Sequence, residues 1–347
     1  MSETNLAAES RLGRIRSTVH ARRWIAALAA AAALIFPFVA GPFPLDLVNQ
    51  FMLAGISALA LMLLTGFAGQ ISLGHAGLLA AGAFTVGILH KELGLPFWVA
   101  LPGAALTGAL VGVVFGLPSL RLRGLYLAIS TLALHFIVIY LGGEYESSRS
   151  HSAGILIDPP SIFGYEAYGG FPWYFILLVI LVLVWTFCRN LVRSRIGRAW
   201  TMIRTKEIVA SAIGVDVART KLLAFVISSA ITAFAGGLFA YYRGFVSIEA
   251  FSLYLAVQYV AMIIIGGMGS LAGALLGAAF VTVLPYIIEG ALFMLPNANQ
   301  YAGAAFAANY AAFGLVMILF LAFEPRGLIG VWDRLGSRAS HGVEETG

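Results

Sequence analysis

Apolar runs of roughly twenty residues, separated by short polar or glycine-rich stretches, dominate the sequence. A helix of this length crosses a hydrocarbon core about 30 Å thick. The third run begins among glycines and gives the weakest signal, so it is either a full span or a broken helix. The pattern predicts an all-α membrane protein with about ten transmembrane helices. The runs cover residues 24–41, 45–65, 70–90, 97–117, 124–142, 171–188, 222–242, 252–268, 271–292 and 303–323.

Composition supports the membrane assignment. Of the 347 residues, 60% are hydrophobic and only 11% are charged, whereas a soluble domain has about 25% charged residues. The single cysteine, Cys188, excludes an internal disulfide. The net charge of +5 comes mostly from arginines in a few polar segments. Such clusters in a membrane protein indicate orientation, and we expect no nucleic-acid partner.

If the chain crosses the membrane ten times, the segments rich in basic residues all lie on the same side of it. The tail 1–23 has five arginines, and the loop 189–221 has eight basic residues against two acidic ones. The positive-inside rule makes both cytoplasmic, together with the tail 324–347. The acidic loop 143–170 is then outside, and residues 24–323 form the transmembrane domain. An arginine-rich tail before an alanine-rich run is also typical of a signal peptide, which would remove the first run.

Ten helices divide into two halves of five, and an odd number per half gives the halves opposite orientations. One pair of segments has a faint likeness. "GQISLGHAGLLAAGAFTV" at 69–86 and "GGMGSLAGALLGAAFVTV" at 266–283 share Ser-Leu, spaced small residues and an apolar end with phenylalanine. We therefore predict a 5+5 inverted repeat.

Polar side chains inside apolar runs are costly unless they have partners or face water. We predict that they line a translocation path, with the first three near its cytoplasmic end. The alternative is that they bond to neighbouring helices or to backbone carbonyls. Glu289 is the only mid-chain acid well inside an apolar run. The predicted path residues are Gln70, Ser72, His75, Ser130, Thr131, His135 and Gln258.

The basic loop contains the segment "TKEIVASAIG", in which apolar residues recur at helical spacing. Glu207 suits the first turn of a helix, and Gly214 suits its end. A short amphipathic helix in a loop needs a surface that covers its apolar face. The membrane surface and a groove on a partner protein are both possible.

Several segments resemble one family in its order along the chain. Glu207, Ala210 and Gly214 look like the Glu-Ala-Ala…Gly loop of ABC importer permeases. Longer segments resemble the LivM-like permeases of branched-chain amino acid importers. These are "GFAGQISLGHAG", "LPSLRLRGLYLAISTLAL", "RSRIGRAWTMIRTKEIVASAIGVDVARTKLLAFVISSAITAFAGGLFA", "IIIGGMGSLAGALLGAAF" and "FEPRGLIG".

The resemblance implies a permease subunit in a bacterial-type inner membrane. The loop helix would sit on separate ATPase subunits, with Arg198, Arg204 and Glu207 as polar contacts. A second permease subunit, usually a different paralogue, would complete the path. An extracytoplasmic solute-binding protein would deliver branched-chain or other amino acids.

No catalytic chemistry is visible in the chain. It has no Walker A pattern, no metal-ligand cluster and no Ser-His-Asp arrangement. We expect no catalytic residue, no metal and no directly bound cofactor, with ATP used by the partner subunits. The protein is therefore expected to be a transport subunit and not an enzyme.

The outer loop departs from the family pattern. "GGEYESSRSHSAGILIDPPSIFG" lacks the Thr-Gly-Gly start that LivM-like permeases have there. This leaves urea, short amides and small organic or aromatic acids as alternative substrates. A stand-alone secondary transporter or channel is a second alternative, disfavoured because no Asp or Lys lies well inside a predicted span to offer an ion-coupling site.

Overall fold

The structure is a computed structural model that describes residues 31–120, 122, 124–149, 154–162, 165–293, 302–323 and 327–330. The chain divides into two units. The first ends at Val48 and contains a helical segment at 31–39 and the start of the next helix. The second unit begins at Asn49 and contains the loops and helices that carry the site.

The long helices follow the apolar runs. Within the described residues, six helices are long and apolar enough to cross a membrane, and two shorter apolar helices accompany them. The chain is an all-α, multi-pass membrane protein; ten spans and cytoplasmic termini stay predictions. The tail 1–23 lies outside the described residues. The main helices are α2 (Pro42–Leu61), α4 (Phe97–Ser119), α5 (Leu125–Ser148), α6 (Gly170–Arg193), α9 (Val217–Arg243), α10 (Leu253–Gly266), α11 (Leu271–Phe293) and α12 (Ala302–Phe323).

The third run differs from the predicted helix over 70–90. α2 continues as the π-helix η1 (Met62–Phe67), and helix α3 (His75–Val86) begins only at His75, followed by the π-helix η2 (Gly87–Glu92). Gly69 has a φ of 70°, in the left-handed region where glycine is at ease. This conformation ends the helical path before residue 70, so the prediction of a helix from 70 onward is wrong at its start.

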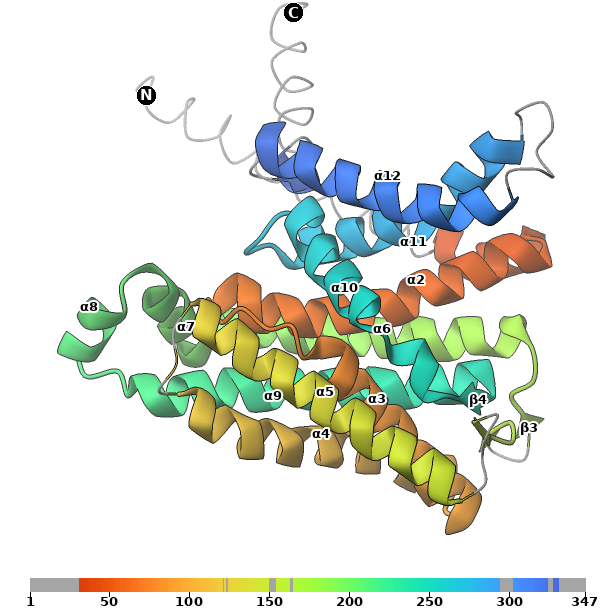
Figure 1. Cartoon of the computed structure of the whole chain (residues 1–347), viewed down its shortest axis with the longest axis horizontal. Helices are drawn as coiled ribbons and strands as arrows, with labels where there is room; N and C mark the ends of the chain where they lie inside the picture. The colour runs from red at the N-terminus through yellow and green to blue at the C-terminus, as the bar shows by residue number, and fades with distance from the viewer. Residues whose placement is uncertain are drawn as a thin grey trace, which may run out of the picture. The chain divides into compact units, whose positions relative to one another are not determined.

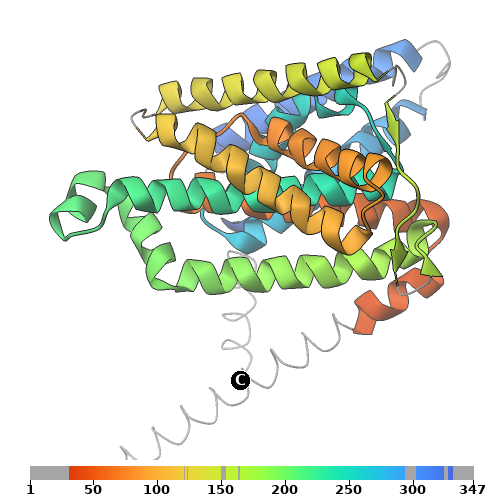
Figure 2. The same ribbon diagram turned by 90° about the horizontal axis from the view of Figure 1, so that it is seen from below.

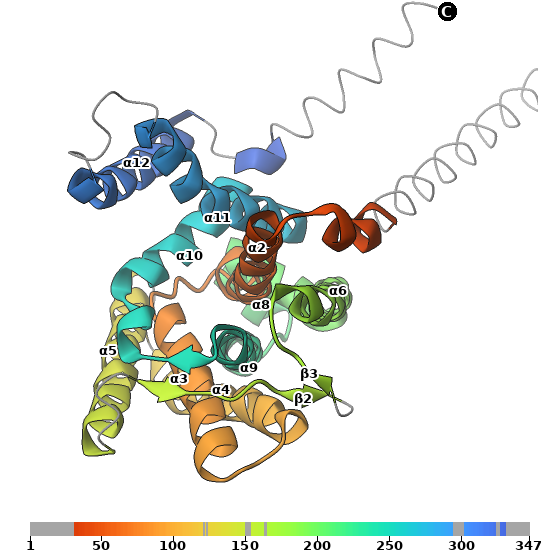
Figure 3. The ribbon, with the colours of Figure 1, turned by 90° about the vertical axis from the view of Figure 1, so that its right-hand side faces the viewer.

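Helix α9 packs against both α3 and α4 (Figure 3). Glycines allow the closest approach. A Cβ at Gly82 of α3 would lie 1.8 Å from the carbonyl oxygen of Ala233, and one at Gly236 of α9 would lie 2.0 Å from that of Leu79. Backbone therefore touches backbone across this interface, which is how small residues bring membrane helices together.

The second unit has two distinct ends (Figures 1 and 2). Helices α7 (Arg195–Thr205) and α8 (Glu207–Ala212) form one, called the α8 end below. The other, the strand end, holds β1 (Ile155–Leu156), β2 (Ser161–Ile162), β3 (Tyr165–Glu166), β4 (Phe245–Val246) and the 3-10 helix η3 (Ile248–Phe251). β1 pairs antiparallel with β4, and β2 with β3.

The two similar glycine-rich segments come to the same end. Gly69 precedes α3 and Gly269 precedes α11, and both lie against Arg204 near the α8 end. Segments related by an inverted repeat would begin at opposite ends. This likeness therefore gives the inverted repeat no support, and the repeat stays a prediction.

The contact between α3 and α9 gives a stability prediction. Gly82→Ala places a methyl group against the Ala233 carbonyl, so we expect a loss of about 1–3 kcal/mol, the usual cost of overpacking. The apparent midpoint of thermal unfolding in detergent should fall. Gly290→Ala is the matched control, because nothing lies within 4 Å of its Cβ position. Equal midpoints for the two variants would contradict the packing described.

Candidate translocation site and coupling loop

The helical path that begins with α2 stops at Phe67 and resumes at His75. Gln70 anchors the intervening segment, because its Nε2 donates to the carbonyl oxygen of Lys221 at 2.9 Å. The carbonyl oxygen of Gln70 accepts from Thr65 Oγ1 at 2.9 Å. Backbone groups inside a membrane protein need such partners wherever a helix is interrupted. The segment between Phe67 and His75, called the helix break below, is therefore an ordered interruption held by specific hydrogen bonds.

The middle of the break rests on α5. The amide of Leu73 donates to Thr131 Oγ1 at 2.9 Å, and this hydroxyl donates to the Ala128 carbonyl at 2.9 Å. Ser72 Oγ accepts from the Gly74 amide at 3.3 Å. Ser72 and Thr131 thus bond to backbone, as the alternative interpretation expects. A path-lining role for either stays a prediction.

His75 is buried where three helices meet. Its Nε2 lies 2.7 Å from Ser57 Oγ on α2, and its Nδ1 lies 3.4 Å from Thr232 Oγ1 on α9. The ring forms a T-shaped pair with Tyr259 of α10, with 4.9 Å between ring centroids. Both ring nitrogens have protein partners, so the histidine fixes the start of α3 to α2 and α9.

Ser130 and His135 lie on α5, apart from this cluster. Ser130 Oγ is 3.5 Å from Ser119 Oγ on α4. His135 is buried against Gly77 of α3, where an added Cβ would lie 2.7 Å from the His135 Cα. Within the described residues, His135 Nδ1 has no hydrogen-bond partner. The structure does not bring these two residues to the buried histidine of the break.

A cavity of about 630 Å³ lies between α2, α9, α10 and α11, and Phe245 of β4 places it toward the strand end. Of the predicted path residues, Gln258 alone is among the described residues that line it. The predicted path residues therefore lie in three places: the helix break, helix α5 and the cavity. Tyr259 lines the cavity and contacts His75 at the end of the helix break.

Sequence reasoning missed Ser57, Thr232, Tyr259 and Arg243. Hydroxyl residues at the first two positions look like ordinary members of apolar helices, and their partners are far away in the sequence. Arg243 ends an apolar run, where a basic residue is commonplace. The one available signal was Glu289, an acid inside an apolar run, which also lines the cavity.

The basic loop contains a helix that was not predicted. Ser194 caps α7 by accepting from the amides of Ile196 and Gly197, as N-cap serines do. Trp200 is fully buried and its Nε1 donates to the Thr220 carbonyl at 2.9 Å. α7 is therefore packed against the start of α9.

The predicted loop helix is present as α8, and Gly214 follows it with a φ of 88°. Ala210 is the buried residue of α8, and Glu207 Oε2 lies 2.9 Å from Lys221 Nζ. Three apolar side chains are exposed on this helix and its end: Ile208 at 83%, Val209 at 52% and Ile213 at 62%. The side of α8 that carries Ala210 packs on the rest of the chain, and the side that carries Ile208 and Val209 faces outward.

Arg204 points into the bundle. Its Nη1 donates to the Gly66 carbonyl oxygen. Its stem lies beside Gly69, where an added Cβ would be 3.0 Å from Cγ, and its Nη1 would be 2.9 Å from a Cβ at Gly269. One arginine thus contacts the segments that precede both α3 and α11.

Arg198 differs from Arg204 in its partner: both are exposed, but Arg198 donates to the nearby Arg193 carbonyl at 3.0 Å and not to the helix break. The roles predicted for Arg198, Arg204 and Glu207 in contacts with an ATPase stay predictions.

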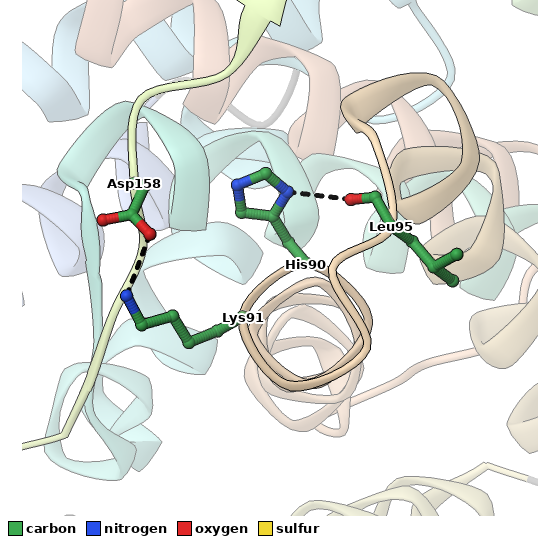
Figure 4. A network of polar contacts seen from close by, with 4 residues as sticks. All are labelled: His90, Lys91, Leu95 and Asp158. Carbon is green, nitrogen blue, oxygen red and sulfur yellow. Dashed lines mark hydrogen bonds and ion pairs between the residues drawn. The ribbon is translucent and has the colours of Figure 1, made fainter.

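At the strand end, an ion pair ties the loop 143–170 to η2 (Figure 4). Lys91 Nζ lies 2.8 Å from Asp158 Oδ2, and His90 Nδ1 donates to the Leu95 carbonyl at 2.9 Å. The hydrogen bond from Lys91, and then its charge, hold the pKa of Asp158 below its usual value. Within the described residues, no group of three His, Cys, Asp or Glu could hold a metal ion.

Long apolar helices around a cavity, with an interrupted helix beneath it, are features of a membrane permease. The family described as branched-chain amino acid transport system / permease component matches residues 43–321. The chain belongs to this family, and the resemblance seen in the sequence is confirmed.

The relatives include transport proteins from several organisms. The high-affinity branched-chain amino acid transport system permease proteins LivM of Salmonella typhimurium and Escherichia coli are each 32% identical, covering 90% of this chain and 76% of theirs. The autoinducer 2 import system permease protein LsrC of an Enterobacter species is 31% identical, covering 62% of each chain. No solved structure matches the chain.

The ion pair at the strand end gives a pH prediction. Because the folded-state pKa of Asp158 is lowered, the pair stabilises the loop above the unfolded value of 3.8. This contribution is lost as the pH falls through the lower folded value. Hydrogen exchange of the amides at 154–158, corrected for intrinsic rates, should therefore accelerate on acidification. Asp158→Asn should exchange fast at neutral pH and lose this pH dependence. The same pH dependence in wild type and variant would contradict the role of the pair.

Proposed function

We propose that the chain is the permease subunit of an ABC importer that moves branched-chain or other amino acids across a bacterial inner membrane. Separate ATPase subunits supply the energy by hydrolysing ATP, and the chain itself is not an enzyme. The relatives named LivM support the substrate class. The six membrane-length helices support the location.

The observation that carries the proposal is the connection between the basic loop and the helix break. Arg204 bonds to the Gly66 carbonyl, Gln70 bonds to the Lys221 carbonyl, and Lys221 pairs with Glu207. A rigid-body displacement of α7 and α8 would therefore move the segment that begins α3. Rigid elements joined by such contacts transmit motion between sites.

The partners follow from the two ends of the second unit. The α8 end carries the basic loop, which the positive-inside rule assigns to the cytoplasm. The exposed side chains Ile208, Val209 and Ile213 suit an apolar groove on an ATPase subunit. The strand end then faces the solute-binding protein. A second permease subunit, a different paralogue, completes the translocation path.

The docking role of α8 can be tested by co-purification. Ile208→Glu places a charge in the apolar contact, so the ATPase should no longer co-purify with the permease. Leu156→Glu is the matched control, because Leu156 is 67% exposed at the strand end. Retention of the ATPase by Ile208→Glu, or its equal loss from both variants, would contradict docking through α8.

The coupling role of Arg204 predicts a different defect. Arg204→Gln removes the charged hydrogen bond to Gly66, a type of contact worth about 1.5–3 kcal/mol. We expect the ATPase to stay bound while ATP-driven leucine uptake in proteoliposomes falls roughly tenfold or more. Arg219→Gln is the control, because Arg219 is exposed and pairs with Asp216 of the same loop. Wild-type uptake by Arg204→Gln would contradict the coupling role.

A further inference from the structure

Two opposite charges line the cavity at the strand end. Arg243 ends α9, and Glu289 lies near the end of α11. Among the described residues, no ion pair joins either side chain to an opposite charge. Both side chains are exposed, so their charges stay hydrated and accessible to a ligand. The cavity therefore offers a cation and an anion to a ligand.

Arg243 is positioned for a carboxylate. Its Cζ lies 5.7 Å from the ring centroid of Phe239, which also lines the cavity. Stacking on an aromatic ring orients the guanidinium while its donors stay available. A planar guanidinium can donate two parallel hydrogen bonds to a carboxylate. Arg243 thus supplies a directional anion site at the cavity.

Glu289 shares a helix face with a second acceptor. Val281, Pro285 and Glu289 recur at intervals of four along α11, which places them on one side, and all three line the cavity. Pro285 has no amide hydrogen, so the Val281 carbonyl lacks its usual helical donor. A carboxylate and a carbonyl at one wall form a suitable environment for an ammonium group.

The remaining cavity lining is mostly apolar, and the volume of about 630 Å³ is within the usual range for small-ligand sites. Aliphatic side chains of the solute would contact this wall. The apolar residues come from α2, α3, α9, α10 and α11, and include Leu53, Leu79, Phe239, Leu255, Met262 and Val281.

We propose that this cavity is an amino-acid subsite in which Arg243 binds the α-carboxylate and Glu289 binds the α-ammonium. The proposal rests on the function proposed above and assigns it a recognition site. The solute is a zwitterion with an apolar side chain, not a neutral amide and not a simple acid. Tyr259, between the cavity and His75, is the connection from this subsite to the helix break.

Both charged side chains are exposed, so their contacts with a solute are screened and individually weak. Weak binding suits a transport path, because a solute must leave each site as readily as it enters. The subsite selects the solute at the entrance and does not trap it.

A cysteine-protection experiment tests the subsite without ATP or partners. Ala250 lines the cavity, and the native Cys188 is buried. The full chain with Ala250→Cys is alkylated by N-ethylmaleimide in nanodiscs. L-leucine should slow the reaction at a concentration about threefold lower than 4-methylpentanoate or 3-methylbutylamine, which each lack one charged group, because an exposed charge pair contributes little. Adding Arg243→Gln or Glu289→Gln should remove this preference.

The controls are charge-removing changes at the same end of the molecule. Arg149→Gln and Glu249→Gln remove charges that do not line the cavity, so protection by leucine should be unchanged in both. Absence of protection, or equal protection by leucine and its two analogues, would overturn the subsite. Loss of the preference in Arg243→Gln alone would also overturn it, because that result identifies a simple acid site.

Uptake separates this proposal from the function on which it rests. In proteoliposomes with the partner subunits, both cavity variants should lower ATP-driven leucine uptake about threefold, with ATPase association unchanged. Wild-type uptake in both variants would overturn the subsite while the importer assignment stands. Protection by leucine without any ATP-driven uptake would support the subsite and overturn the importer assignment.

Discussion

The need to satisfy backbone groups inside a membrane is the constraint on which the rest of this structure depends. An unbroken helix meets that need with its own hydrogen bonds, but residues 68–74 are not helical and must find other partners. The Gln70 backbone bonds to Leu64 and Thr65 at the end of the preceding helix, and the Leu73 amide bonds to Thr131 of α5. The Gln70 side chain adds a bond to the Lys221 carbonyl. The interrupted helix is stable because neighbouring helices and the basic loop supply hydrogen-bond partners. The structure of the break therefore depends on their positions.

This dependence is the physical basis for the proposed coupling between the basic loop and the helix break. Arg204 contacts Gly66, Gly69 and Gly269, so both glycine-rich segments meet one side chain of the loop. π-Helical turns such as η1 often occur at functional sites. His75 fixes the start of α3 to α2 and α9. The basic loop therefore contacts the chain where the helical path is interrupted.

The hydrophobic pattern predicted most helices, because bilayer thickness sets the length of a membrane helix, and that length is visible as an apolar run in the sequence. The helix after Lys206 was also predictable from its spacing and from Gly214. Other features depended on tertiary contacts that no local pattern encodes. From the sequence, Trp200 looks like an exposed side chain in a polar loop, whereas the structure buries it in α7. Ser57 and Thr232 gain significance only because distant folding brings both to His75.

The proposed roles also place recognition and movement in different parts of the second unit. Opposite charges lie at the strand end, while the helix break and its arginine lie toward the α8 end. Tyr259 contacts both regions, since it lines the cavity and packs on the histidine that begins α3. A change in the position of α3 would therefore alter the cavity wall through this contact and through Leu79, which belongs to α3 and lines the cavity. Neutral, tightly packed residues between the two regions suit this role, because a packed core transmits displacement without offering the solute another charged site.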